Sequence, residues 1–428
     1  MTLYISCLYL MKKSLYKYKK SFSLFLAVAC FLTRNVRLFF VPLSTITIFW
    51  FLFLFLLKYK KYKTKAKRFP WNVPMLFWGT SIVLTSIFSI SGFSSEITTM
   101  LGNLLKGIFL IIILWSVIDT KEDFFRLYRY LSIVFFISCI YGFIEYFMGC
   151  NPLQSYLANF AGISDAVVWS YSAEQYRGYR ICSIFEHAMG AGVNWSLYAV
   201  FTIYLFIRRN KELKHKYFCM FTAIMCIVCV FLSKCRSPLL FLAFFSLALV
   251  QIESKRFYKF LLFSAPVVII CAVVAYKYSS ALQSIVDIVF FNGTGEMGIE
   301  SSSLTLREVQ IATSFNLMKI SPLVGLGTHY KDVLSQSMTY YILGGEGILI
   351  FVPAVYGILG LIAYSIMAFY DIVFIPLKYK TKECFFLGLA YWITNMFSSM
   401  PGLITFIYYL FMIYFIRNSR GWNVNEYS

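Results

Sequence analysis

Uninterrupted apolar runs constrain the fold of this chain more than any other feature. One of them, FFVPLSTITIFWFLFLFLL at 39–57, contains no charged residue, and crossing a bilayer core about 30 Å thick takes roughly 20 such residues. Of the 428 residues, 60% are hydrophobic and only 14% are charged. That leaves too few polar side chains to cover a water-exposed surface of this size. The sequence therefore predicts an all-α, polytopic integral membrane protein.

Twelve segments are apolar enough to be predicted as transmembrane helices, and together they form a single membrane domain over residues 1–428. Two connections between them are long, at about 149–187 and 277–343, and long connections in compact proteins are usually functional. The twelve predicted spans are approximately 21–33, 38–57, 71–92, 101–118, 131–148, 188–207, 217–233, 237–252, 260–276, 347–369, 384–400 and 403–416.

Lysine and arginine are concentrated in alternate connections, which predicts the orientation. With both termini in the cytoplasm, 28 of the 39 Lys and Arg fall in cytoplasmic segments, as the positive-inside rule requires, and both long loops face outward. The formal net charge of +20 is then chiefly a topology signal. It does not indicate a nucleic-acid partner, because blocks such as KYKKYKTKAKR adjoin predicted spans, where anionic membrane lipids are the natural partner. A signal sequence with its apolar core ending near Leu32 is the alternative for the first span.

The sequence contains no motif for nucleotide or metal chemistry. It has no GxxxxGK[ST] loop, no HExxH motif and no Cys/His pair with metal-ligand spacing, so we expect neither a cofactor nor a metal. Cys226 and Cys229 lie one helical turn apart within a predicted span, as small apolar packing residues do. Cys150 and Cys182 bracket the first long loop and have the option of a disulfide in an oxidising compartment.

Four arginines fall on the predicted outer face, where the positive-inside rule makes arginine uncommon. Arg177 and Arg180 lie in the first long loop, Arg236 in the turn LSKCRSP, and Arg307 in the second long loop. A planar guanidinium group binds phosphate oxygens through bidentate, charge-assisted hydrogen bonds. The four arginines therefore predict a binding site for a diphosphate, and the alternative is that each is solvated or snorkels to the headgroups.

Other ionisable residues are candidates for a general base or an intramembrane role. Glu186, His187 and His329 lie in the outer loops, and histidine changes charge near neutral pH. Lys106 and Glu145 lie within predicted spans, where a charge is a functional candidate by default, although both are close enough to a span end to snorkel.

The second long loop contains a predicted amphipathic helix at 304–320. Its sequence, LTLREVQIATSFNLMKI, places Leu306, Val309, Ala312 (or Thr313) and Leu317 at near-helical spacing. We expect this apolar face to lie on the outer leaflet. The helix is predicted to break at SPLVGLG.

The order of these motifs resembles the O-antigen ligase and polymerase family of bacterial cell-surface polysaccharide assembly. Members have an Arg-containing turn between two mid-chain helices, then a large periplasmic loop with an Arg, a break like NPLxGxG and a helix with GxxG near its start. Here the corresponding segments are KCRSP, LREVQ, SPLVGLG and TYYILGGEGILIF, and YRICSIFEHAMGAG resembles the upstream segment RxxGxFxxPNxxA. The resemblance covers roughly 170–360.

The resemblance implies a metal-independent glycosyl transfer on the outer side of the bacterial cytoplasmic membrane. A polyprenyl-pyrophosphate-linked oligosaccharide gives up its glycan to a hydroxyl of another lipid-linked repeat unit, which builds O-antigen, capsular or exopolysaccharide. An apolar groove between spans would hold the polyprenyl tail. By this resemblance the pyrophosphate is bound by Arg236 and Arg307 with Arg177 and Arg180 in support, and the base is Glu186, His187 or His329.

Two other functions stay open. Ligases of the family carry a His-Asn pair before the GxxG helix, where this sequence has Gln336 and Ser337, so the sequence favours a polymerase over a ligase that transfers polymer to a lipid acceptor. A transporter or flippase of lipid-linked sugars would be expected to show inverted repeats, which the sequence lacks. A chain-length regulator protein is a further expected partner of a polymerase.

Overall fold

The computed structural model describes residues 67–118, 120–153, 179–185, 187–209, 211–213, 215–235, 237–244, 304–335, 347–397 and 406–422, together with isolated positions between 37 and 56. The described elements are helices, apart from one antiparallel pair of two-residue strands, β1 (Arg37–Leu38) and β2 (Val41–Pro42). The predicted spans 21–33 and 260–276 lie outside the described residues, and 237–252 is described only to residue 244.

Four described helices are long and apolar enough to cross a membrane by length and composition. The first runs through α5 (Phe93–Asn103), the π-helix η1 (Leu104–Phe109) and α6 (Leu110–Val117). The second is α7 (Lys121–Met148) and the third is α10 (Ala188–Arg208). The fourth runs through α18 (Ile348–Phe369), the π-helix η3 (Tyr370–Phe374) and α19 (Ile375–Tyr379). A polytopic membrane protein is therefore supported, while the count of twelve spans stays a prediction.

The remaining described helices are shorter. Two of them are apolar, α4 (Asn72–Ile87) and α11 (Lys216–Leu232). Close to the predicted last two spans lie α20 (Lys382–Phe397) and α21 (Phe406–Ser419). The second long loop contains α15 (Leu304–Met318) and the single turn α16 (Tyr330–Val333).

Several element boundaries differ from the prediction for local reasons. The span predicted from residue 38 begins instead with the strand pair, because Pro42 disfavours the helical conformation in the residue before it. The fifth predicted span starts ten residues early, at Lys121. There the Thr120 hydroxyl accepts a hydrogen bond from the Asp123 amide (3.2 Å), and the acidic side chains of Glu122 and Asp123 favour a helix N-terminus.

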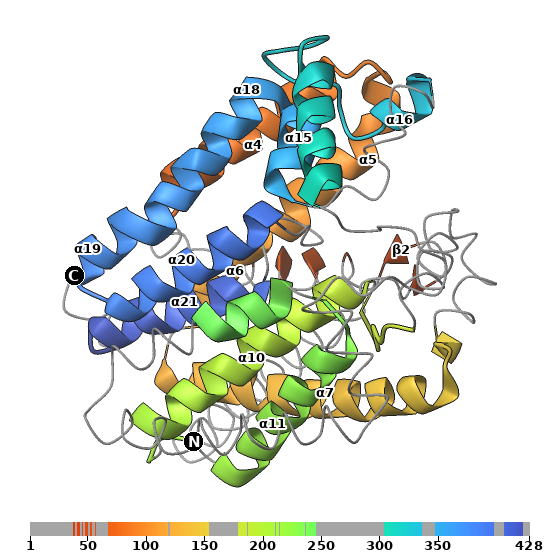
Figure 1. Ribbon diagram of the computed structural model, residues 1–428. Helices are drawn as coiled ribbons and strands as arrows, with labels where there is room; N and C mark the ends of the chain where they lie inside the picture. Colours follow the sequence, from red (N-terminus) through yellow and green to blue (C-terminus); the bar gives the residue numbers. More distant parts are fainter. Residues whose placement is uncertain are drawn as a thin grey trace, which may run out of the picture.

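The helices form two groups joined by α21 (Figure 1). In one group α4 and α15 pack along α18, and in the other α7 and α10 both pack against α11. Every residue of α21 from Phe406 to Arg417 is buried, and this helix contacts α6, α10 and α20. A helix that is hydrophobic on all sides belongs in an interior, and the ring of Phe411 stacks on that of Phe201 at 3.7 Å.

Three predicted cytoplasmic segments meet at one end of the molecule. Lys121 forms an ion pair with Glu212 (2.5 Å), and the Tyr204 hydroxyl donates to the Glu383 carboxylate (3.2 Å). The ring of Phe124, at the same end of α7, packs on that of Tyr414. This grouping fits the predicted orientation, and the assignment of this end to the cytoplasm stays a prediction.

A buried carboxylate ties three helices together near the end of α18. Asp371, in η3, accepts hydrogen bonds from the indole nitrogens of Trp71 (2.6 Å) and Trp392 (2.9 Å) and from the hydroxyl of Tyr409 (3.3 Å). The three donors belong to the start of α4, to α20 and to α21. Because each polar atom of this cluster has a partner, we read Asp371 as structural.

Candidate functional site

The segment SPLVGLG, at 321–327, pairs with a break in α18. Gly357 has a non-helical backbone (φ 60°, ψ −154°) within α18, which frees backbone groups on both sides of it. The amides of Leu326 and Gly327 donate to the carbonyls of Ala354 (2.9 Å) and Val355 (3.1 Å). On the other side of the break, the amides of Ile358 and Leu359 donate to the carbonyls of Pro322 and Leu323.

Because of this pairing, the segment 321–327 does not lie wholly outside the predicted spans, as the prediction of an outer loop at 277–343 implied. Gly357 lies nine residues into α18, or about 13 Å along the helix axis, so 321–327 re-enters against a predicted span. The other side of the segment is held by α4, where the buried Thr85 hydroxyl donates to the Val324 carbonyl (2.6 Å). Irregular backbone at such a depth is stable only where protein groups satisfy it, as these do.

Two glycines allow the close approach. Gly325 and Gly327 have φ of +72° and +92°, which L side chains rarely adopt. A Cβ on Gly325 would lie under 3.0 Å from the Val355 carbonyl, and one on Gly327 would meet Ser89 and Glu96 equally closely. The two glycines of SPLVGLG thus allow the chain to pass between α4 and α18.

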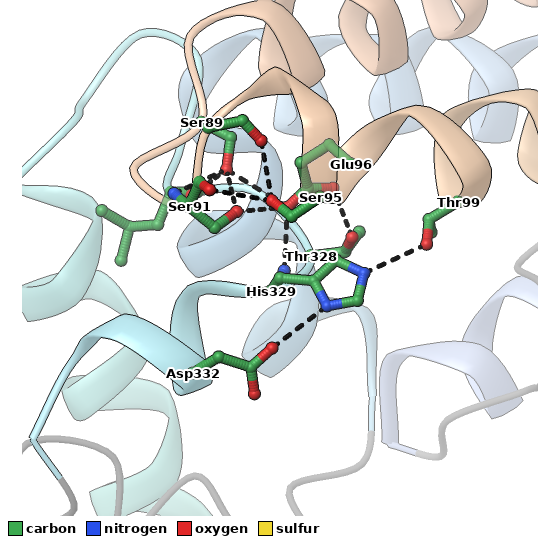
Figure 2. A network of polar contacts seen from close by, with 10 residues as sticks. Ser89, Ser91, Ser95, Glu96, Thr99, Thr328, His329 and Asp332 are labelled. Carbon is green, nitrogen blue, oxygen red and sulfur yellow. Dashed lines mark hydrogen bonds and ion pairs between the residues drawn. The ribbon is translucent and has the colours of Figure 1, made fainter.

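Beyond Gly327, a buried glutamate holds the chain in place (Figure 2). Glu96, on α5, has only 1% of its surface exposed. Its carboxylate accepts hydrogen bonds from the His329 amide (2.9 Å), from the Thr328 hydroxyl and from the hydroxyls of Ser89 (3.1 Å) and Ser91 (3.2 Å). Charge-assisted hydrogen bonds are the stronger kind, so Glu96 fixes the backbone at His329.

The imidazole of His329 lies between a carboxylate and a hydroxyl (Figure 2). Its Nδ1 is 3.1 Å from Asp332 Oδ2, and its Nε2 is 3.2 Å from the Thr99 hydroxyl oxygen. The His329 side chain is 39% exposed, so a substrate can reach it. A carboxylate on one ring nitrogen and an alcohol on the other is the arrangement of a general base.

Replacing Glu96 by glutamine should loosen this loop. The amide group of Gln brings its own hydrogens toward donors, so at least one of the four hydrogen bonds is lost at a cost of about 1–3 kcal/mol. We expect amide hydrogen exchange at 325–329 to accelerate by roughly tenfold or more, measured by mass spectrometry. Glu308→Gln, at an exposed position on α15, is the matched control, and equal exchange in the two variants would contradict the assigned role.

A second buried glutamate holds the end of the first long loop. Glu145, near the end of α7, is fully buried and accepts hydrogen bonds from the amides of Cys182 (3.0 Å) and Ser183 (2.6 Å) and from the Tyr179 hydroxyl (2.8 Å). It therefore does not snorkel but positions the segment 179–185. No disulfide joins Cys150 to Cys182 in the structure.

The segment fixed by Glu145 places Arg180 within electrostatic range of Lys234. Lys234 lies in the turn after α11. Burial and then the positive charge of Arg180 lower the pKa of Lys234. Arg180 Nε is buried and has no hydrogen-bond partner in the described structure. Cys235, beside Lys234, packs with Cys182, Ala188 and Met189 at the start of α10, so the pair lies near a helix N-terminus.

The other predicted site residues have mixed outcomes. His187 caps α10 by accepting the Met189 amide at Nδ1 (3.2 Å), which gives its ring a structural task. Arg307 is half-buried on α15, with its guanidinium 3.4 Å from the Gln310 side-chain oxygen. Arg177, Glu186 and Arg236 lie outside the described residues.

The predicted apolar face of α15 is split in the structure. Val309 and Ala312 are exposed, as residues that face the outer leaflet would be, whereas Leu317 is buried together with Gln310 and Ser314. That this face lies on the outer leaflet stays a prediction. The Ser314 hydroxyl donates to the Ile350 carbonyl (2.6 Å), so α15 packs on α18 through a largely polar face. Tertiary packing, rather than the apolar stripe, decides its orientation.

An apolar groove lies between α4 and the helix that contains η1. It has a volume of about 450 Å³. Gly79 lies opposite Leu104 and Ile108, and Leu84 lines the groove next to Thr85, which holds the 321–327 segment. The groove therefore extends toward the segment that carries His329.

Sequence reasoning missed Glu96, Thr99, Asp332 and Lys234. The available signals were weak: Glu96 is a single acidic residue that follows four serines, and Asp332 is three residues from His329. Within the described residues, no cluster of three or more His, Cys, Asp or Glu side chains has the geometry to hold a metal ion.

Comparison with known proteins finds a family that part of the chain resembles. Residues 221–365 match the O-antigen ligase family, whereas no curated protein matches the chain. The matched segment begins in α11 and includes Lys234, Arg236, Arg307, His329 and the break at Gly357. This confirms the resemblance seen in the motifs. This part of the chain is therefore similar to the O-antigen ligase family, whose enzymes act on lipid-linked glycans in surface polysaccharide synthesis.

Proposed function

We propose that the protein is a polymerase of polyprenyl-pyrophosphate-linked repeat units on the outer side of the cytoplasmic membrane. A hydroxyl of one lipid-linked unit attacks the anomeric carbon of another, the glycosidic bond forms, and polyprenyl pyrophosphate departs. The observation that carries the proposal is His329, held by Glu96 between Asp332 and a hydroxyl, inside the family domain.

His329 is the general base of this proposal. The Asp332 carboxylate orients the imidazole through Nδ1, which leaves Nε2 to take the proton of the attacking hydroxyl. The Thr99 hydroxyl, at 3.2 Å from Nε2, marks the position that the acceptor hydroxyl would take. Glu96 acts through the backbone and is a positioning residue.

The cationic groups stabilise the leaving group. Negative charge grows on the departing pyrophosphate, and fixed guanidinium and ammonium groups can stabilise it without a metal. The positive charge of Arg180 acts on Lys234, and Arg236 is two residues from Lys234 in the sequence. A cationic pair that is partly buried is costly by itself, and an anionic ligand would offset that cost. Arg236 and Arg307 complete the proposed set, with Arg177 in support.

The groove between α4 and η1 is the proposed seat of the donor's polyprenyl tail. The reacting anomeric carbon is bonded to the pyrophosphate, which is bonded to the lipid. The donor's tail must therefore enter the membrane close to the base, whereas the acceptor's lipid is a repeat unit away. The groove, which extends toward the His329 segment, meets this requirement.

Alanine at Arg236 or Arg307 should lower polymer formation by roughly 10²–10³-fold, the usual effect of removing one charge-stabilising donor. The measurement is a gel ladder from purified protein and lipid-pyrophosphate repeat units, with no nucleotide or metal added. Lys319→Ala removes an exposed cation from the turn that follows α15 and should leave the ladder unchanged. A normal ladder from both arginine variants would refute the pyrophosphate role.

A ligase is the second candidate, because the matched family is described as O-antigen ligase and the His329–Asp332 pair supplies a base despite Gln336 and Ser337. The same preparation should then transfer preformed polymer to a separate lipid acceptor. Transfer without a ladder would favour the ligase, and neither product from folded protein would favour a transporter.

A further inference from the structure

A pocket of about 580 Å³ lies at the opposite end of α7 from Glu145. Its walls come from the first three turns of α7 and from the connection between α10 and α11. The proposed site around His329 does not include this pocket. The predicted orientation places the pocket at the cytoplasmic surface.

The pocket carries an excess of positive charge. Its basic side chains are Lys121, Arg126, Arg129 and Lys211, and its acidic ones are Glu122 and Glu212. Glu212 is already neutralised, because Lys121 (2.5 Å) and Arg209 (3.3 Å) both pair with it. Among the described residues, no carboxylate forms an ion pair with Arg126, Arg129 or Lys211. Three cations are thus available to a ligand.

The rest of the pocket is apolar, and it includes residues of both α7 and α11 where these two helices pack together. Phe125, Tyr128, Leu213 and Cys219 contribute to its walls. Further along the seam the ring of Phe136 contacts those of Phe218 and Phe221, and Phe221 is 55% exposed. Because α7 is a candidate membrane span, the pocket lies at a membrane surface with an apolar track leading away from it.

We infer that this pocket binds the phosphate headgroup of an anionic phospholipid, with the acyl chains along the α7–α11 seam. Basic pockets between spans on the cytoplasmic side recognise such headgroups. The guanidinium groups of Arg126 and Arg129, three residues apart on one helix face, suit a phosphate. A free phosphate ion would leave the apolar walls and the seam unused. The inference does not rest on the proposed enzymatic function.

Native mass spectrometry of the full-length protein in detergent tests the inference. The probes are phosphatidylglycerol, phosphatidylcholine with the same acyl chains, and inorganic phosphate. We expect one tightly retained phosphatidylglycerol. Arg126→Gln/Arg129→Gln/Lys211→Gln should weaken its binding by roughly a hundredfold at low ionic strength, since each basic residue near a membrane surface contributes about fivefold and the three factors multiply.

Two further variants serve as controls. Lys378→Gln/Lys380→Gln/Lys382→Gln removes the same charge from another predicted cytoplasmic segment that does not line the pocket, and it should bind phosphatidylglycerol normally. Arg126→Lys/Arg129→Lys keeps the charge and therefore separates a loss of binding from misfolding. It should show an intermediate loss of phosphatidylglycerol affinity. The inference is overturned if phosphatidylcholine binds equally well, if inorganic phosphate displaces the lipid, or if the control triple variant loses binding to the same extent.

Discussion

His329→Ala should lower the rate of glycan transfer by roughly 10²–10⁴-fold, the range that a general base contributes, with normal protein abundance. The physical reason is that Nε2 takes the proton of the attacking hydroxyl and alanine leaves no acceptor there. The measurement is the initial rate of ladder formation by purified protein. Because the variant leaves a cavity of imidazole size, added imidazole should restore part of the rate.

The chain has only three histidines, so a complete panel is practical. His215→Ala, at an exposed position before α11, should retain full activity. His187→Ala removes the cap on α10, which costs about 1 kcal/mol of stability, and should keep the activity. If His187→Ala rather than His329→Ala stops the reaction, the base lies at the start of α10 and the assignment here is wrong.

Gly325→Ala should strongly destabilise the fold. Alanine at φ +72° costs about 1–2 kcal/mol, and its Cβ would overlap the Val355 carbonyl, which adds about 1–3 kcal/mol of strain. Four backbone hydrogen bonds between 321–327 and α18 depend on this approach. We expect a large drop in the apparent melting temperature of the purified protein, or failure to accumulate.

The matched control is Gly149→Ala. Gly149 also has a left-handed backbone (φ 64°, ψ 14°) but has nothing within 4 Å of an added Cβ. It therefore reports the backbone cost alone. Equal shifts in melting temperature for the two variants would show that SPLVGLG does not pack closely against α18.

Much of the fold could be predicted from sequence because hydrophobic length is a local property. Spans such as 188–207 and 217–233 correspond to α10 and α11 within a residue. The ends of α5 and α7 were misplaced, because polar residues that start a helix, such as Thr120, do not look apolar. The face of α15 that packs on α18 was not predicted, because it is formed by Gln310 and Ser314 as well as Leu317, and no apolar pattern marks it.

The candidate site also shows this difference between local sequence patterns and tertiary contacts. Sequence alone determined the membrane class and the order of the motifs, and it pointed to His329, Arg180 and the SPLVGLG break as candidates, since each is written in consecutive residues. Only the tertiary structure showed that Glu96 holds His329 from 233 residues away, that the charge of Arg180 acts on Lys234, and that the break pairs with Gly357. These contacts join distant segments, and which buried donor meets which acceptor is decided by helix packing that no local pattern encodes.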